Sequence, residues 1–189
     1  MQENQVLKTI YGRRSIRKYE ERSVPREVID ELLSAAVMSP SAMNKQPWEF
    51  VVVTDRNVIK ELSDRVKKKL GTLGYLQRFA EKVTSREDLV FYGAPLLIIV
   101  TAPKKSQWAG VNMSIVDCAI LSQTMLLAGH SLGLGSCFIG FAFLLNDDPD
   151  AIRTLGIVED RIIAAPLIFG YPAEVKGIPE RKPKISKWI

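Results

Sequence analysis

Residues 112–130, NMSIVDCAILSQTMLLAGH, form the segment that most restricts how this chain can fold. Their length and composition predict a helix, and apolar side chains fall on nearly every side of that helix rather than on one stripe. The most polar exceptions, Asn112, Asp117, Gln123 and His130, are too few to make a solvated face. We therefore expect this helix to lie at the centre of a core or in an interface between subunits.

Other segments have the patterns of ordinary helices and strands, set by helical apolar spacing or by β-branched runs. The expected helices are 25–38, 57–70, part of 71–92 and a short one between Pro149 and Gly156, and the expected strands are 48–54, 95–101 and 162–170. No repeat or linker divides the chain, so we expect one domain over residues 1–189. Alternating helices and strands indicate an α/β or α+β class.

The composition is that of an ordinary globular protein, with 189 residues, 47% of them hydrophobic and 25% charged. A net charge of +5 suits anionic ligands but is too small to indicate nucleic acid. The first residues lack the apolar core of a signal peptide, and no run of 18 apolar residues occurs. We expect a cytoplasmic protein without a membrane or nucleic-acid partner.

Several kinds of catalytic site find no support in the sequence. Cys118 and Cys137 lie far apart without CxxC spacing, and with His130 they cannot supply an ordinary zinc site. The stretch GLGSCFIG, residues 133–140, follows a helix and has Phe138 where GxGxxG needs glycine. We expect Cys137 to be a packed thiol in an apolar turn and His130 to end a helix.

The stretch YGRRSIRKYE, residues 11–20, places four cations around one hydroxyl group. In an extended chain Arg13, Ser15 and Arg17 point to the same side, whereas Arg14 and Lys18 face elsewhere or flank them. Two guanidinium groups and a hydroxyl on one side suit a dianionic phosphate monoester. The segment is a candidate phosphate clamp, and a solvated basic loop is the alternative.

A second unusual stretch, SPSAMNKQPWEF, occupies residues 39–50 between an expected helix and an expected strand. Its small residues permit close backbone approach, and the Asn44 amide offers both a donor and an acceptor. This combination suits a flat heterocycle with alternating donors and acceptors. A polar turn is the alternative.

Four motifs in this order resemble the FMN-dependent nitroreductase family. They are RRSIRKY, SPSAMNKQPWEF, DCAILSQTMLLAGHSLGLGSCFIG at 117–140 and RKP at 181–183, and they cover nearly the whole chain. The resemblance implies a nitroreductase-like α+β fold, with a central, mostly antiparallel sheet flanked by helices, in an intertwined homodimer. The apolar helix at 112–130 is similar to the family's dimer-core helix.

The resemblance also implies which residues hold FMN. They are Arg13, Arg14, Ser15 and Arg17 for the phosphate and ribityl chain, Pro40 and Ser41 for the isoalloxazine of the partner subunit, Asn44 for a hydrogen bond near the reactive edge of the ring, the backbone of Ile139 and Gly140 for the ring, and Arg181 with Lys182 for the phosphate.

The implied activity is that of an FMN-dependent oxidoreductase. NADH or NADPH would pass hydride to the flavin and leave, and a nitroaromatic, quinone or similar small-molecule acceptor would then enter the same cleft, in ping-pong order. No side chain is singled out as a catalytic acid or base, because the hydride chemistry belongs to the cofactor.

Two departures from familiar family members bear on substrate choice. Ile139 stands where many members have glutamate, and Pro179 where many have lysine. Two alternatives stay open. One is a flavoprotein of the same fold that catalyses dehalogenation or flavin fragmentation. The other is a non-enzymatic basic module that binds nucleic acid or acidic partners through RRSIRK, KKK and RKPKISK.

Overall fold

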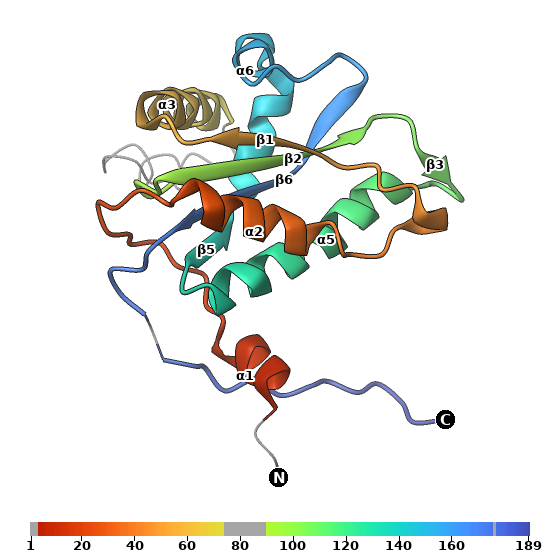
Figure 1. Ribbon diagram of the computed structural model, residues 1–189. Coiled ribbons are helices and arrows are strands. Elements are labelled where there is room, and N and C mark those ends of the chain that lie inside the picture. Colours follow the sequence, from red (N-terminus) through yellow and green to blue (C-terminus); the bar gives the residue numbers. More distant parts are fainter. Residues whose placement is uncertain (1–3, 74–89, 176) are drawn as a thin grey trace.

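A four-stranded sheet forms the middle layer of the computed structural model, which describes residues 4–73, 90–175 and 177–189 (Figure 1). Its strands, in spatial order, are β1 (Glu49–Val53), β2 (Leu96–Pro103), β6 (Arg161–Gly170) and β5 (Gly135–Phe138). Each neighbouring pair is antiparallel. The expected antiparallel sheet is confirmed, as are the three strands expected from β-branched runs.

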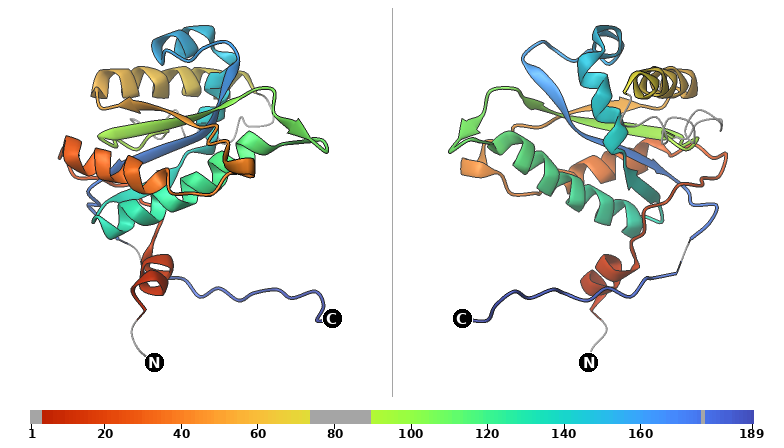
Figure 2. Two further views of the ribbon diagram at one scale, coloured as in Figure 1. Left: turned by 45° about the vertical axis from the view of Figure 1, so that its right-hand side comes forward. Right: turned by 180° about the vertical axis from the view of Figure 1, so that it is seen from behind.

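Helices cover both faces of this sheet (Figure 2). One face carries α2 (Arg26–Ala36) and α5 (Met113–Ser131), and the other carries α3 (Arg56–Thr72), the 3-10 helix η3 (Gly140–Asp147) and α6 (Pro149–Thr154). Successive residues of a strand point to opposite faces. Leu96 and Ile98 of β2 accordingly join the core under α2 and α5, whereas Leu97 and Ile99 join the core under α3. Because both faces of the sheet are buried, β2 is apolar at successive positions rather than at alternate ones.

Several elements were not expected from the sequence. They are α1 (Gln5–Gly12), the 3-10 helix η1 (Ala42–Asn44), the hairpin of β3 (Gln107–Trp108) and β4 (Val111–Asn112), and β5. The expectation that Cys137 lies in an apolar turn was wrong, because it lies in β5 and pairs with Ile168 of β6. Gly135 and Ser136 have little intrinsic strand preference, so pairing with β6 determines this strand. Most of the helical region expected at 71–92 falls outside the described residues.

The α5 helix is the central element of the face that it shares with α2. Its buried side packs on β2 and β6 in a core that contains Cys118, Leu121 and Met125. Among the described residues it is the one helix long and apolar enough to cross a membrane by length and composition, criteria that the core helix of a globular protein also meets. Gly129 allows α5 to lie close to β6, since a Cβ at this position would be 2.9 Å from a ring carbon of Phe169.

We predict that Gly129→Ala lowers the free energy of unfolding by about 1–3 kcal/mol, because the added methyl group forces the Phe169 ring or α5 to shift. Gly71→Ala in α3 is the matched control. Its Cβ would meet no atom within 4 Å, so the better helix former should raise stability by about 0.5–1 kcal/mol. Thermal unfolding at one protein concentration measures both. A Gly129→Ala protein as stable as the wild type would contradict this packing.

Candidate functional site

The basic segment that follows α1 runs in an extended conformation beside β5. Ser15 pairs with Ser136 in a parallel bridge, and the Ile16 N–H donates to the Ser136 carbonyl at 2.9 Å. Ile16 is buried against Gly135, where a Cβ would lie 2.8 Å from its side chain. The missing side chain at Gly135 therefore lets the segment lie against the sheet edge, and the bridge fixes which of its residues face the same way.

Arg13, Ser15 and Arg17 all act on the thiol of Cys137. Burial raises the pKa of Cys137, while the charge of Arg17, a hydrogen bond with Ser15 and the charge of Arg13 oppose that rise. The three alternate residues thus share one side of the extended segment. The arrangement has the spacing that a phosphate clamp needs, and their role in binding stays a prediction.

The positive charge of the clamp is not balanced by carboxylates among the described residues. Burial and then the like charges of Arg14 and Arg181 lower the pKa of the Arg13 guanidinium. Within the described part of the chain, Arg13, Arg14 and Arg17 form no ion pair, and the buried Nε of Arg14 has no hydrogen-bond partner. An anion with several acceptor oxygens would satisfy these groups.

The C-terminal tail returns to the clamp through one of its two predicted residues. Arg181 lies close enough to Arg13 to lower the pKa of that guanidinium. Lys182 instead pairs with Glu180 at 3.0 Å in solvent. Figure 1 shows the tail passing below the body of the molecule near α1.

A cavity of about 380 Å³ opens next to the clamp. Arg17 lines it together with Tyr92, whose ring centroid is 5.7 Å from the guanidinium carbon, and with residues 137–141. The Ile139 N–H donates to Pro166 and its carbonyl accepts from Ala142, so its backbone groups are engaged. Gly140 differs, because a Cβ there would meet no atom within 4 Å. Of the two predicted ring contacts, Gly140 is the one with open space.

The second motif forms a strained loop beside the N-terminal half of α5. Met43, Asn44 and Gln46 have positive φ angles of 52°, 53° and 45°, which non-glycine residues rarely adopt. The Gln46 side chain donates to Asn44 Oδ1 at 3.0 Å, and the Gln46 N–H donates to Ser41 Oγ at 2.9 Å. Such strain persists only where surrounding contacts hold it.

Residues distant in sequence supply those contacts. The Ala42 N–H donates to Asp117 Oδ1 at 3.0 Å, and Ser39 is hydrogen-bonded to Thr124 at 2.8 Å, both partners lying on α5. Arg161 of β6 donates to the Pro47 carbonyl at 2.7 Å. Sequence reasoning missed these anchors. The available signal was Asp117 itself, a carboxylate within an otherwise apolar helix.

The clamp and the loop lie toward opposite ends of α5. Gly12, directly before the clamp, lies against His130, whereas the loop is bonded to Asp117. The step of thirteen residues from Asp117 to His130 spans about 20 Å at 1.5 Å per residue. Pro40, Ser41 and Asn44 therefore lie apart from the clamp in the single chain.

The thiols and the imidazole are not poised for nucleophilic or acid–base chemistry. Burial raises the pKa of Cys118 to about 12 and raises that of Cys137, so both are protonated at neutral pH. Burial, followed by the charge of Arg13, lowers the pKa of His130, which favours the neutral imidazole. These directions agree with packed thiols and a helix-end histidine.

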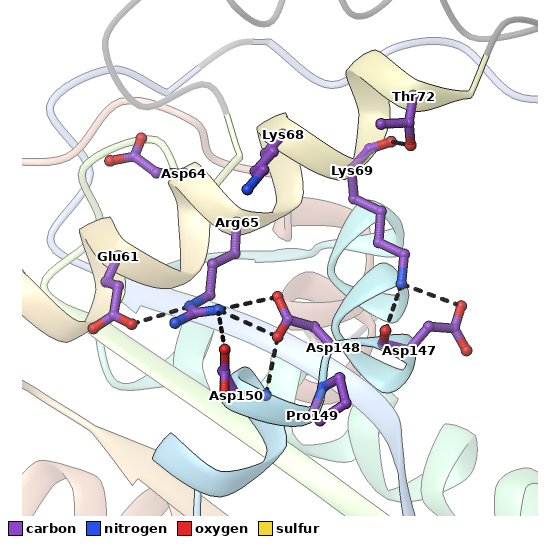
Figure 3. Close-up of a pocket in the computed structure, with 10 residues that line it drawn as sticks. All are labelled: Glu61, Asp64, Arg65, Lys68, Lys69, Thr72, Asp147, Asp148, Pro149 and Asp150. Carbon is purple, nitrogen blue, oxygen red and sulfur yellow. Dashed lines mark hydrogen bonds and ion pairs between the residues drawn. The ribbon is translucent and has the colours of Figure 1, made fainter.

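A different charged cavity, of about 660 Å³, lies between α3 and the start of α6, on the face of the sheet opposite α2 and α5 (Figure 3). Arg65 pairs with Glu61 at 3.0 Å and with Asp148 at 3.2 Å, and Asp148 also caps α6. Lys69 pairs with Asp147. Arg65 and Lys69 already have carboxylate partners, and Asp64 and Asp150 also line the cavity beside Lys68, so the cavity offers little to a phosphate.

Comparison with known proteins places the chain in a family. The model of the nitroreductase family matches residues 10–171. The chain belongs to this family. A crystal structure of a nitroreductase with bound FMN from Bacteroides fragilis is 31% identical, with a TM-score of 0.83 over 99% of this chain and 98% of that one. The resemblance carried by the four motifs and the expected α+β fold are both confirmed.

Two relatives with different names match most of this chain. An iodotyrosine deiodinase of Nematostella vectensis is 35% identical, covering 93% of this chain and 71% of its own. A 4-nitrobenzoate reductase of a Nocardioides species is 28% identical, covering 86% of this chain and 78% of its own. Membership of the nitroreductase family therefore does not by itself fix the substrate.

We predict that Gly140→Leu removes bound flavin without unfolding the protein. The new side chain has free space within the subunit, but it would occupy the cavity beside Arg17, so FMN affinity should fall about tenfold or more. Gly71→Leu, at another glycine with open surroundings, should keep its flavin. Flavin content after gel filtration, with circular dichroism as the folding control, measures this. Unchanged flavin content in Gly140→Leu would show that the cavity lies off the cofactor site.

Proposed function

We propose that this protein is an FMN-dependent oxidoreductase that takes hydride from NADH or NADPH and delivers it to a small-molecule acceptor such as a nitroaromatic or a quinone. The observation that carries the proposal is the partly buried cluster of Arg13, Ser15 and Arg17, without carboxylate partners among the described residues, beside the open cavity at Gly140. The FMN bound in the related nitroreductase structure supports it.

The residues present fit a bound FMN. The clamp guanidinium groups form no ion pair with described residues, and the Arg14 Nε has no hydrogen-bond partner among them, so both suit the FMN phosphate. The space at Gly140 admits a flat ring against the backbone. Bound FMN would supply the hydride chemistry. The chain's own residues would bind the phosphate, orient the ring and exclude water from it. No thiol or imidazole of the chain is required as a proton carrier at the reacting atoms.

The same proposal includes a homodimer. The side of α5 that faces away from the sheet exposes Ile115, Val116, Ala119 and Ile120. An apolar face of this kind on a central helix is typical of an obligate interface. We propose a two-fold axis perpendicular to α5, which makes the two α5 helices antiparallel and brings the loop end of one helix to the clamp end of the other. Each flavin would then lie between the clamp of one chain and the loop of its partner.

The extended ends of the chain support this dimer. No residue of α1 is buried, and Val6, Leu7, Ile10 and Tyr11 are exposed on it. The tail exposes Val175, Ile178, Ile185 and Trp188. Both segments lie below the body of the molecule in each view (Figures 1 and 2). A second subunit would bury these side chains.

A reducing cytoplasm is the compartment that we propose for this enzyme. Cys118 and Cys137 are both free and buried, and the nicotinamide donor is a small soluble metabolite. Free thiols are usual where disulfides do not persist.

Reductive dehalogenation is the second candidate, supported by the 35% identity to an iodotyrosine deiodinase. Reoxidation of the reduced protein under anaerobic conditions separates the two activities. A halotyrosine that reoxidises the flavin faster than nitroaromatics and quinones would favour dehalogenation.

The Arg13→Ala/Arg17→Ala double variant tests the flavin assignment. The wild-type protein should show flavin absorption that NADH or NADPH bleaches without oxygen. The double variant should lose several kcal/mol of FMN binding, at about 1.5–3 kcal/mol per charged hydrogen bond. Arg26→Ala, which removes an exposed arginine paired with Asp30, is the control and should retain its flavin. A colourless wild type would refute the function, and full occupancy in the double variant would refute the clamp.

We predict that Ile120→Asp prevents dimerisation and flavin binding. Ile120 is 42% exposed in the single chain, so a charge there is tolerable unless a second subunit covers it. Val158→Asp, on an exposed residue outside α5, is the control. Sedimentation and flavin content at micromolar concentration measure the outcome. An Ile120→Asp protein that stays dimeric, or a flavin-loaded wild-type monomer, would count against the interface.

A further inference from the structure

A cavity of about 460 Å³ lies between the loop at 39–47 and the β3–β4 hairpin. Ala42, Met43 and Lys45 form its wall on the loop, Lys105 and Trp108 form the wall on the hairpin, and the start of α5 closes it. The volume is within the usual range for small-molecule sites. It is separate from the clamp cavity, and it shares the loop that lines the isoalloxazine in the proposed function.

The two walls carry unusually exposed apolar side chains. Trp108 is 74% exposed and Met43 is 82% exposed. An indole and a thioether on the sides of one cavity provide stacking and dispersion contacts for a flat ring. These walls favour an aromatic ligand over an aliphatic one.

The charges around the cavity favour an anion. Lys45 and Lys105 both line it, and neither forms an ion pair within the described ranges. The carboxylate in the lining, Asp117, is only 4% exposed and accepts the Ala42 N–H at 3.0 Å. The accessible charge is therefore positive, at the two lysines, while the negative charge is buried and already hydrogen-bonded.

We infer that this cavity binds the electron acceptor and selects aromatic molecules that carry a carboxylate. The inference rests on the proposed function, because only then does the loop bring the bound ring beside the flavin. Lys45 and Lys105 contact the carboxylate, and Trp108 stacks on the ring. For a nitrobenzoate, the hydride from NADH or NADPH and one solvent proton convert the nitro group to a nitroso group and release one water.

Benzoate and its neutral analogue benzyl alcohol test the site without turnover. Calorimetric titration of the oxidised holoenzyme should show tighter binding of benzoate. The Lys45→Met/Lys105→Met variant should bind benzoate about five- to tenfold more weakly, which is the size of two solvent-exposed ion pairs, and should bind benzyl alcohol as the wild type does. Trp108→Ala should weaken both. Lys104→Met, on a neighbouring lysine outside this cavity, should change neither.

Steady-state kinetics with 4-nitrobenzoate and 4-nitrobenzyl alcohol give the second readout. The ratio of their kcat/KM values should fall about five- to tenfold in the double lysine variant, because only 4-nitrobenzoate carries a carboxylate for the lysines to contact. Equal benzoate affinity in that variant would overturn the proposal. So would a raised KM for NADH or NADPH with unchanged benzoate binding, since the lysines would then serve the donor. If NADH and NADPH do not reduce the wild-type flavin at all, the proposed function is wrong. If they do reduce it but the ratio of the two kcat/KM values is unchanged in the variant, only the acceptor site is wrong.

Discussion

The packing of α5 on the central sheet determines where every part of the proposed site lies. One side of this helix is buried against β2 and β6, and the other side is apolar but exposed in the single chain. Asp117, in its N-terminal half, fixes the strained loop, and His130, at its end, lies against Gly12, directly before the clamp. The helix therefore holds the clamp and the loop toward opposite ends, which is the arrangement that the proposed two-chain site requires.

The clamp depends on a second constraint, the pairing of an irregular segment with the sheet edge. Ser15 and Ser136 form the bridge, and Gly135 lets Ile16 approach closely. Extended geometry then places Arg13 and Arg17 on one side. The positive charge gathered there has no ion-pair partner among the described residues, so a bound phosphate would relieve the repulsion between the guanidinium groups.

The sequence predicts the parts of this structure that local patterns determine. The β-branched runs indicated β2 and β6, and alternation along the chain indicated that Arg13 and Arg17 share a side. It did not predict β5, whose strand conformation comes from pairing with β6, nor the left-handed backbone of Asn44, which contacts with α5 stabilise from far along the chain. The separation of clamp and loop also required the structure, because it depends on how α5 crosses the sheet.

The central claim is that each flavin site combines the clamp of one chain with the loop of the other, and a mixed dimer tests it most directly. One subunit carries Arg13→Ala/Arg17→Ala and the other carries Ser41→Trp, with different affinity tags so that the mixed dimer can be purified. Each variant alone should lack flavin. A shared site predicts one FMN per mixed dimer, because one of the two sites has an intact clamp and an intact loop. A mixed dimer without FMN would contradict the account, since it would mean that clamp and loop act within the same chain.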